Sequence, residues 1–277
     1  MMKIELYPPQ EPMSANMLAY HKKLVSQADE SRAHEIQYGA DPYQSLMVYP
    51  ADQPDGTVLM YMHGGGWTNG YKEWMAFMAP AHNALGVTFA TVGYRLAPQH
   101  VFPAGFQDCG DALRWLANNV AQYGGDPEQI FVGGHSAGGH YAALLATAEA
   151  LPDGGDVRSL IRGCAPVSGS YYFGEDSGMA VRPRFLGAPE AGNERHAAPL
   201  WRLSGPACPF LLTWGENDFP HLIAQARKMS DALQQHGTRV DTLVLPGQDH
   251  FTASYAAGEA GGLWPNRLHS WMLSITG

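Results

Sequence analysis

The sequence has few cysteines, few basic residues and no long apolar run. Its three cysteines, Cys109, Cys164 and Cys208, lie far apart, without the CxxC spacing of a metal site or the even number of a disulfide framework. The 17 Lys and Arg are outnumbered by 26 Asp and Glu, and this acidic balance opposes binding to nucleic acid phosphates. No apolar stretch is long enough to span a bilayer, and the first residues lack the apolar core of a signal peptide. We therefore expect a cytoplasmic protein with reduced cysteines, and neither nucleic acid nor a membrane as partner.

The remaining composition is that of a globular protein. Hydrophobic residues make up 45% of the 277 residues and charged residues 16%, with glycine and proline spread along the chain. Because α/β folds of this size often have one core, we expect a single domain over residues 1–277, with a homodimer left open. Residues 1–32 predict an N-terminal helical segment that starts after Ser14 and packs across the body or the mouth of a site, with one apolar side at Met17, Leu18, His21, Leu24 and Val25.

Apolar runs alternate with helical patterns along the rest of the chain. Two short stretches, 34–38 and 44–49, predict antiparallel edge strands, and mostly apolar runs at 57–62, 87–92, 129–132, 210–214 and 240–245 predict strands buried on both faces. Helical periodicity at 109–120, 222–233 and 268–275 completes an α/β alternation, which predicts a central, mainly parallel sheet flanked by helices. An active site is then expected beyond the carboxyl ends of the strands. Residues 170–209 fit this alternation least well and predict short helices that form a lid or part of a pocket.

The segment around Ser136 predicts a nucleophile held at a sharp turn. An apolar strand runs into Gly134-His-Ser-Ala-Gly138, and an apolar helix follows from Tyr141. The two glycines lack Cβ atoms, so the chain can turn tightly and hold Ser136 in a strained conformation with its Oγ exposed. The alternative is a glycine-rich turn with a helix-capping serine. The strand before Ser136 and the helix after it favour the interpretation of Ser136 as a nucleophile.

A run of three glycines, His63-Gly-Gly-Gly-Trp67, follows the predicted strand at 57–62. Glycines leave backbone N–H groups accessible to a ligand oxygen, so we expect Gly65, Gly66 and Ala137 to donate the hydrogen bonds of an oxyanion hole. His63 is expected to brace this loop rather than to act as a base. A flexible connecting loop is the alternative, but the motif precedes the elbow in the order that the mechanism expects.

A reactive serine needs a base and a carboxylate that orients the base, and in this type of fold they follow in the order Ser, Asp or Glu, His. Asp218 comes directly after the predicted strand at 210–214, and His250 lies in the loop after the last predicted strand. We assign Asp218 as the acid and His250 as the base. Glu216 and Asp249 are the rival carboxylates, and each could instead form a salt bridge, be solvated, or accept a bond from a backbone amide.

These motifs together resemble the esterase/lipase branch of the α/β-hydrolase fold that includes the hormone-sensitive lipase family and the arylformamidases. The resemblance rests on His63–Trp67, Gly93-Tyr-Arg-Leu-Ala-Pro98, Phe102-Pro-Ala104 with Asp108, Gly124-Gly-Asp-Pro127 and Gly134-His-Ser-Ala-Gly-Gly139. His140 and the context Asp249-His250-Phe251 look more like arylformamidases than hormone-sensitive lipases. The resemblance implies a hydrolase that cleaves an ester or amide through an acyl-enzyme, with no metal and no organic cofactor. Because the N-terminal segment is too short for a large cap domain, we expect a small or minimal lid.

The expected substrate is a small molecule, and three functions are weighed. A small carboxylic ester comes first, an N-formyl aryl amide of the formylkynurenine type second, and non-catalytic ligand binding on the same scaffold third. Candidate substrate-binding residues are Trp67, His135, His140, Tyr171 and Phe219. For the scattered aromatic residues, simple core packing is the alternative.

Overall fold

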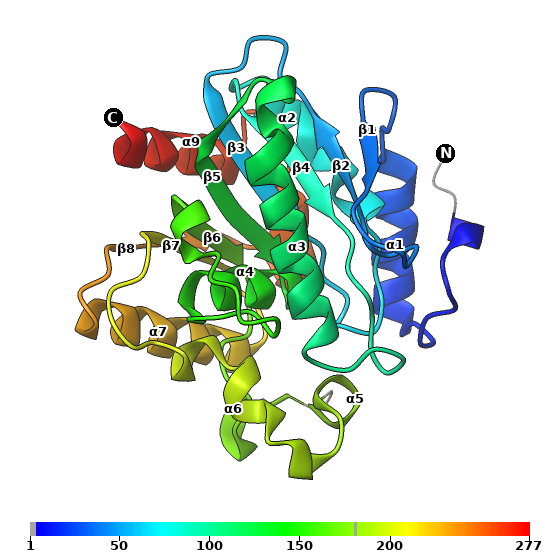
Figure 1. The fold of residues 1–277 in the computed structure, drawn as a ribbon, viewed down its shortest axis with the longest axis vertical. Helices are drawn as coiled ribbons and strands as arrows, with labels where there is room; N and C mark the ends of the chain where they lie inside the picture. Colours follow the sequence, from blue (N-terminus) through cyan, green and yellow to red (C-terminus); the bar gives the residue numbers. More distant parts are fainter. Residues whose placement is uncertain (1–3, 180–181) are drawn as a thin grey trace.

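One continuous sheet organises residues 4–179 and 182–277, the part of the chain that the computed structural model describes (Figure 1). Within these residues eight strands follow the order β1-β2-β4-β3-β5-β6-β7-β8. The hairpin of β1 and β2 is antiparallel, β2 runs antiparallel to β4, and all other pairs are parallel, as predicted. The strands are β1 His34–Gln37, β2 Ser45–Tyr49, β3 Gly56–Met62, β4 Thr88–Val92, β5 Gly125–His135, β6 Gly163–Val167, β7 Phe210–Gly215 and β8 Val240–Leu245.

Three features of the sheet differ from the sequence prediction. Strand β2 is not at an edge, because it pairs with both β1 and β4 and all five of its residues are buried. Strand β8 is an edge strand and is not buried on both faces, since Val244 is 43% exposed. Strand β6 was not predicted, because its sequence Gly163-Cys-Ala-Pro-Val167 contains a proline and has no β-branched residue before the last position.

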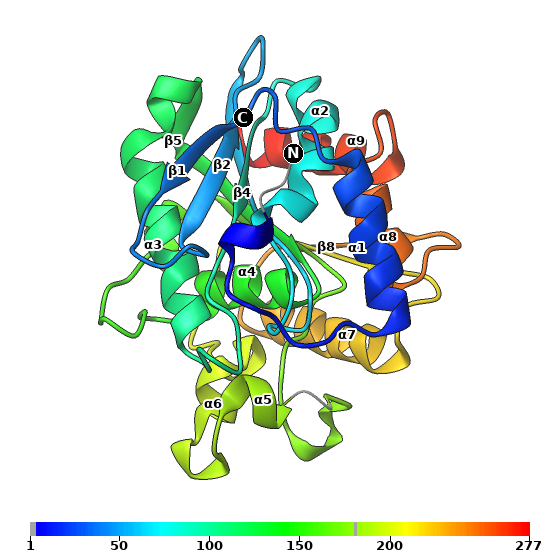
Figure 2. The ribbon, with the colours of Figure 1, turned by 90° about the vertical axis from the view of Figure 1, so that its right-hand side faces the viewer.

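Helices cover both sides of the sheet. In Figure 2, α3 lies on one side of the strands, whereas α1, α2, α8 and α9 lie on the other. Helix α9 contributes two buried indoles, Trp264 against Tyr61 at 6.0 Å and Trp271 against Phe131 at 5.8 Å between ring centroids. The helices are α1 Ala15–Gln27, α2 Ala79–Asn83, α3 Ala104–Asn119, α4 Ala137–Thr147, α5 Arg182–Leu186, α6 Asn193–Ala197, α7 Pro220–Gln235, α8 His250–Ala256 and α9 Leu263–Thr276.

Helix α1 begins where the sequence predicts, because the Ser14 side chain accepts a hydrogen bond from the Met17 N–H. Its inward side largely follows the predicted one, since Leu24 is buried and Met17, His21 and Val25 are partly buried. Leu18 is the exception at 42% exposed, and Tyr20 is buried without having been predicted. The helix lies beside α8 (Figure 2), where the hydroxyls of Tyr20 and Ser254 are hydrogen-bonded at 2.7 Å. The N-terminal segment is therefore packed onto the body of the protein.

The segment 170–209 forms short helices, as predicted, and is anchored to the rest of the chain. Helices α5 and α6 lie together at one end of the molecule (Figure 1). The Phe185 ring of α5 stacks on Trp67 with centroids 4.3 Å apart, and the carbonyl of Ala197 in α6 accepts a hydrogen bond from His140. Aromatic stacking thus joins this segment to the glycine loop, and a buried hydrogen bond joins it to helix α4.

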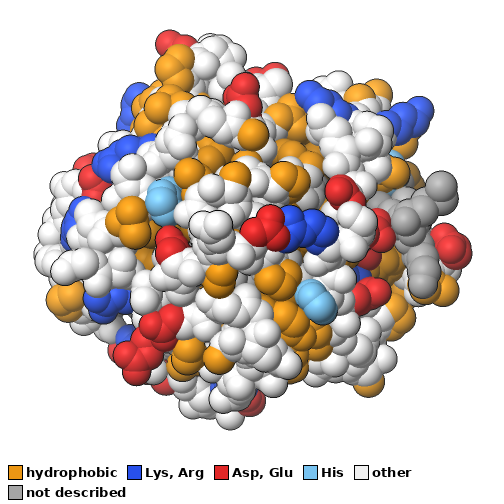
Figure 3. All heavy atoms as spheres, turned by 90° about the horizontal axis from the view of Figure 1, so that it is seen from above, with side chains coloured by type: hydrophobic (Ala, Val, Ile, Leu, Met, Phe, Trp, Pro, Cys, Tyr) orange, Lys and Arg blue, Asp and Glu red, His pale blue; other side chains and the backbone are white. Residues whose placement is uncertain are grey.

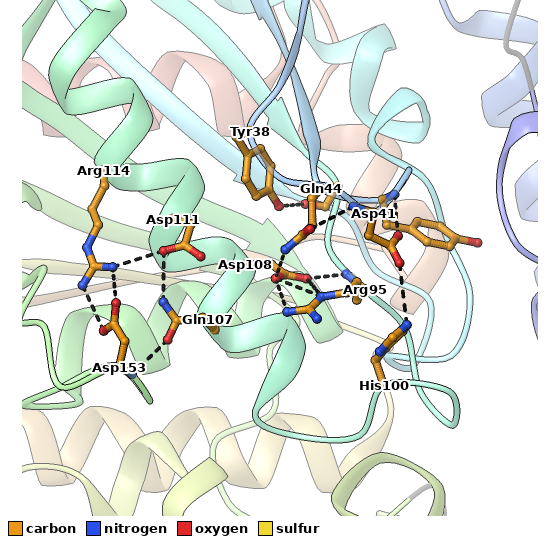
Figure 4. Close-up of polar contacts among 12 residues, drawn as sticks. Tyr38, Asp41, Gln44, Arg95, His100, Gln107, Asp108, Asp111, Arg114 and Asp153 are labelled. Atoms are coloured by element: carbon orange, nitrogen blue, oxygen red, sulfur yellow. Dashed lines mark hydrogen bonds and ion pairs between the residues drawn. The ribbon is translucent and has the colours of Figure 1, made fainter.

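The Arg95 and Asp108 motif residues form a structural ion pair between the chain after β4 and helix α3 (Figure 4). The Arg95 guanidinium donates to both carboxylate oxygens of Asp108, and the Arg95 N–H donates to the same carboxylate at 2.8 Å. Gln44 completes the coordination of this buried carboxylate. The pair therefore fixes the loop that follows β4.

The molecular surface carries charges of both signs. Figure 3 shows acidic and basic side chains scattered among apolar and neutral ones on one face of the molecule. Among the described helices, none combines the length and the apolar character needed to cross a bilayer.

Candidate active site

The register of the parallel strands brings the predicted motifs to one edge of the sheet. Met62, the last residue of β3, pairs with Gly134 of β5, and Val167 of β6 pairs with both His135 and Thr213 of β7. The chain segments that follow these strands therefore start at the same edge of the sheet. The glycine loop, Ser136 and the segment that carries Asp218 meet there.

Ser136 sits in a strained backbone conformation at the turn between β5 and α4. Its φ of 56° and ψ of −115° are unfavourable for a residue with a side chain, and its N–H is held by the Val167 carbonyl at 2.9 Å. A Cβ on Gly134 would lie 2.3 Å from the Gly138 carbonyl carbon, and one on Gly138 would lie 2.1 Å from the Met62 oxygen. The turn therefore requires both glycines, as the sequence indicates.

Ser136, His250 and Asp218 form a continuous hydrogen-bonded chain. His250 Nε2 lies 3.0 Å from Ser136 Oγ, and His250 Nδ1 lies 2.9 Å from Asp218 Oδ1. Asp218 also accepts hydrogen bonds from the Phe219 N–H at Oδ1 and from the Ser168 hydroxyl at Oδ2. The structure thus brings together the three residues that the sequence order predicts, and adds Ser168, which that order did not identify.

The carboxyl group of Asp218 stays ionised despite being buried. Burial by itself raises its pKa, but the hydrogen bonds and charge of His250, with those from Ser168 and Phe219, outweigh this effect and hold the pKa below its usual range. An ionised Asp218 accepts the Nδ1–H of His250. The lone pair of Nε2 then faces Ser136 Oγ.

His250 is the first residue of helix α8, so the prediction that it lies in a long loop is wrong. The loop ends at Asp249, whose carboxylate caps this helix and accepts N–H bonds from its first turn. The other rival carboxylate, Glu216, accepts a bond from the Gly247 N–H at 2.7 Å. Asp249 and Glu216 therefore both accept bonds from backbone amides, which is one of the alternatives that the sequence left open. Of the three carboxylates, Asp218 is the one that contacts the His250 ring.

The glycine loop leaves two backbone N–H groups free to meet a ligand. Gly65 and Gly66 have φ values of 120° and 63°, and the Gly65 carbonyl accepts bonds from Thr68 and Asn69, which closes the turn. Neither glycine N–H donates to another described residue. Ala137 starts α4, so its N–H has no acceptor within the helix. The pocket that contains Ser136 is lined by both glycines.

His63 braces this loop, as expected. It is fully buried, its ring stacks on Tyr94 with centroids 4.2 Å apart, and the Tyr94 hydroxyl donates to the His63 carbonyl at 2.7 Å. Burial lowers the pKa of His63 to about 4, so its imidazole is neutral near pH 7. A neutral stacked ring holds the loop without taking part in proton transfer to Ser136.

A half-enclosed pocket of about 330 Å³ lies in front of Ser136 and His250. Of the five predicted substrate-binding residues, it is lined by Trp67, His135 and Phe219. The sequence did not identify most of the remaining wall, although it placed the first helix at the body or mouth of a site. That wall consists of Ser14, Met17 and Tyr20 of the α1 segment together with Trp74, Ser170, Gly178, Met179, His221, Leu222 and Phe251.

The other two predicted substrate-binding residues, His140 and Tyr171, are not among the residues that line the pocket. Nδ1 of His140 accepts the Trp67 indole N–H at 3.0 Å, and its Nε2–H donates to the Ala197 carbonyl at 2.6 Å. Tyr171 is fully buried, and Gln225 accepts a bond from its backbone N–H. Both residues therefore support the walls from behind.

His135 links the nucleophile turn to the base. Its Nε2–H donates to the backbone carbonyl of His250 at 2.8 Å, and the two rings lie 4.8 Å apart. Burial, followed by the nearby charge of His250, lowers the pKa of His135 to about 3. A neutral His135, covalently next to Ser136, thus holds the backbone of the residue whose ring contacts Ser136.

A strained serine between a strand and a helix, followed by an acid and a histidine at later strand ends, defines the nucleophile-elbow class of α/β folds. A sequence model of the family described as alpha/beta hydrolase fold matches residues 59–254, and the chain belongs to this family. Within the described residues, no group of three or more His, Cys, Asp or Glu is arranged to hold a metal ion.

The chain is similar to several proteins named as esterases. It is 32% identical to Esterase LipC of Mycobacterium tuberculosis over 238 residues, which cover 78% of this chain and 58% of LipC. It is 47% identical to Carboxylesterase NlhH of the same organism over 123 residues, 42% of this chain and 38% of NlhH. The chain thus spans only part of these relatives' length. The solved structure of a Pyrobaculum calidifontis esterase is similar with a TM-score of 0.77 and 25% identity, covering 97% of this chain and 99% of that one.

Proposed function

We propose that this chain is a serine hydrolase that cleaves a small, neutral carboxylic ester through an acyl-enzyme intermediate. The observation that carries the proposal is the hydrogen-bonded chain from Ser136 Oγ through His250 to Asp218, at 3.0 and 2.9 Å. Its similarity to proteins named as esterases supports the same reaction class.

The reaction starts when His250 Nε2 takes the proton of Ser136 and Ser136 Oγ attacks the carbonyl carbon of the ester. The negative charge on the carbonyl oxygen is stabilised by the N–H groups of Gly65, Gly66 and Ala137. The alkoxy group then leaves with the proton from His250, and the acyl group stays on Ser136. A water molecule, deprotonated by His250, attacks the acyl-enzyme and releases the acid.

The pocket favours an uncharged substrate. None of the described residues that line it is Asp, Glu, Lys or Arg, and its walls are mostly aromatic and aliphatic. A charged group on the substrate would lose its hydration there without gaining an ion partner. Its volume of about 330 Å³ lies at the lower end of the range for ligand pockets. Both properties suit a compact ester.

The second candidate, an N-formyl aryl amide, receives weaker support from the same walls. Trp67, Trp74 and Phe219 suit an aromatic ring. Formylkynurenine, however, also carries an ammonium and a carboxylate, for which the pocket supplies no charged partner. A neutral N-formyl anilide would fit better than formylkynurenine itself.

The test is a kinetic panel of p-nitrophenyl esters of increasing chain length, formylkynurenine and a neutral N-formyl anilide. We expect the highest kcat/KM for a short ester. Ser136→Ala and His250→Ala should abolish turnover, whereas His269→Ala, on helix α9 away from the pocket, should not change it. Labelling by an organophosphonate should be lost in Ser136→Ala and kept in His269→Ala. Labelling of another serine in that variant would reject the assignment.

We also propose a cytoplasmic location, supported by the three cysteines. All three are free thiols, with Cys109 and Cys164 buried and Cys208 partly buried, as is common in reducing compartments. Fractionation of cells that express the tagged full-length protein tests the location. Light scattering of the purified chain tests the predicted alternative of a homodimer.

A further inference from the structure

Three residues other than glycine have a positive φ in the described part of the chain: Trp67 at 62°, Ser136 at 56° and Ser168 at 54°. Trp67 belongs to the glycine loop and Ser136 is the nucleophile. Backbone strain of this kind persists where the surrounding structure enforces it, and it concentrates at functional sites. Ser168, the third strained residue, is hydrogen-bonded to Asp218 but is not itself a reacting group.

Ser168 follows directly after β6 and contacts the acid of the triad. Its side chain is buried and its hydroxyl donates to Asp218 Oδ2, while its N–H donates to the Thr213 carbonyl at 2.8 Å. The preceding residue, Val167, accepts the Ser136 N–H through its carbonyl. One dipeptide at the end of β6 therefore holds the backbone of the nucleophile and the side chain of the acid.

We infer that Ser168 is a positioning residue, which holds the Asp218 carboxylate in the one orientation that directs Oδ1 at His250. The inference rests on the proposed function and deepens it. Ser168 acts through Asp218 and is not among the residues that line the pocket.

The geometry of the carboxylate explains why a second donor is needed. Oδ1 accepts two bonds, from His250 Nδ1 and the Phe219 N–H, whereas Oδ2 accepts a bond from the Ser168 hydroxyl. The Asp218 side chain has no exposure to solvent, so water cannot replace a lost donor at Oδ2. Without the Ser168 hydroxyl, Oδ2 of the buried Asp218 carboxylate has no hydrogen-bond donor. Rotation of the carboxylate away from His250 then lowers its free energy. A hydrogen bond to a charged group corresponds to a factor of about 10 to 100 in an equilibrium constant.

Two substitutions separate the hydroxyl from the backbone strain. Ser168→Ala removes the hydroxyl and keeps a side chain in the left-handed conformation, whereas Ser168→Gly removes the hydroxyl and relieves that strain. We expect both variants to lose about 10- to 100-fold in kcat/KM for p-nitrophenyl acetate, through kcat and with KM nearly unchanged. The matched control is Ser45→Ala, a buried serine in β2 whose hydroxyl donates to the Pro42 carbonyl. It should keep wild-type kinetics.

The decisive measurement is a double-mutant cycle with Asp218→Asn. If Ser168 acts through the carboxylate, Ser168→Ala should cause little further loss in the Asp218→Asn background. An equal loss in both backgrounds would show a general structural role and overturn the inference. So would wild-type kcat in Ser168→Ala, or recovered kcat in Ser168→Gly. A wild type that neither hydrolyses the ester nor binds phosphonate would instead reject the proposed function, and the inference with it.

Discussion

Gly65→Ala tests whether the glycine loop supplies the oxyanion donors. A Cβ at this position would lie 2.0 Å from the Asn69 oxygen and 2.6 Å from the Asn69 carbonyl carbon, and φ is 120°. Both neighbouring atoms belong to the backbone, so no side-chain rotation can relieve the contact. The loop must therefore move, and its N–H groups move with it.

The size of the effect follows from the loss of one donor. Removing one oxyanion hydrogen bond lowers kcat by about 10² to 10³. KM should change little, because the donors act mainly on the charge that develops in the transition state. Stopped-flow or steady-state hydrolysis of p-nitrophenyl acetate measures both parameters.

Two other glycines with positive φ provide matched controls. At Gly66, with φ of 63°, the nearest atom to an added Cβ is Thr68 Oγ1 at 4.0 Å, so we expect Gly66→Ala to lose less than about tenfold in kcat. Gly154, with φ of 86°, has no atom within 4 Å and is not among the residues that line the pocket. Gly154→Ala should lower stability by about 1 kcal/mol without changing kinetics. The reasoning is refuted if Gly65→Ala keeps kcat within threefold of the wild type, or if Gly66→Ala loses as much.

Three further predictions follow from buried polar groups. Burial lowers the pKa of His82 to about 4, whereas an unfolded histidine titrates near pH 6.5, so the unfolded state binds more protons between these values and stability falls as pH falls through this window. Between pH 7 and pH 5, the free energy of unfolding measured by urea denaturation should therefore fall by about 1–2 kcal/mol less in His82→Phe than in the wild type. An equal fall in both proteins would contradict the lowered pKa of His82. Asp108→Ala leaves Arg95 without its buried partner and should lower stability by about 3–5 kcal/mol; an unchanged Tm would show that the pair is not structural. His135→Phe keeps a ring but removes the donor to the His250 carbonyl, so kcat/KM should fall by up to about tenfold, and unaltered kinetics would show that this bond does not position the base.

The strand ends and the order of the motifs could be predicted because each depends on local sequence. Apolar runs with flanking turn residues identified β3, β4, β7 and β8, and the spacing of two glycines around Ser136 identified the elbow. Strand β6 could not be identified in this way, because it owes its strand conformation to its neighbours on both sides rather than to its own residues. Ser168 was missed with it.

The walls of the pocket depend on contacts between distant segments, which a single sequence does not report. Tyr171 and Phe219 are both aromatic residues near the predicted site, yet Tyr171 is fully buried while Phe219 is 44% exposed at the pocket. Equally, the sequence places the first helix at the body or the mouth of a site, but it does not show which side chains of α1, such as Met17, line the pocket of Ser136. The chemistry of the site is encoded in short motifs, whereas its selectivity depends on how the chain folds back.

This separation has a consequence for how the shape of the pocket can be altered. The family match covers residues 59–254, which contain the whole triad, whereas Ser14, Met17 and Tyr20 lie before it. Ser136, Asp218 and His250 and this part of the pocket wall therefore come from separate stretches of the chain. For the protein engineer, the α1 side chains that line the pocket are positions at which its shape can be altered while those three residues keep their own sequence.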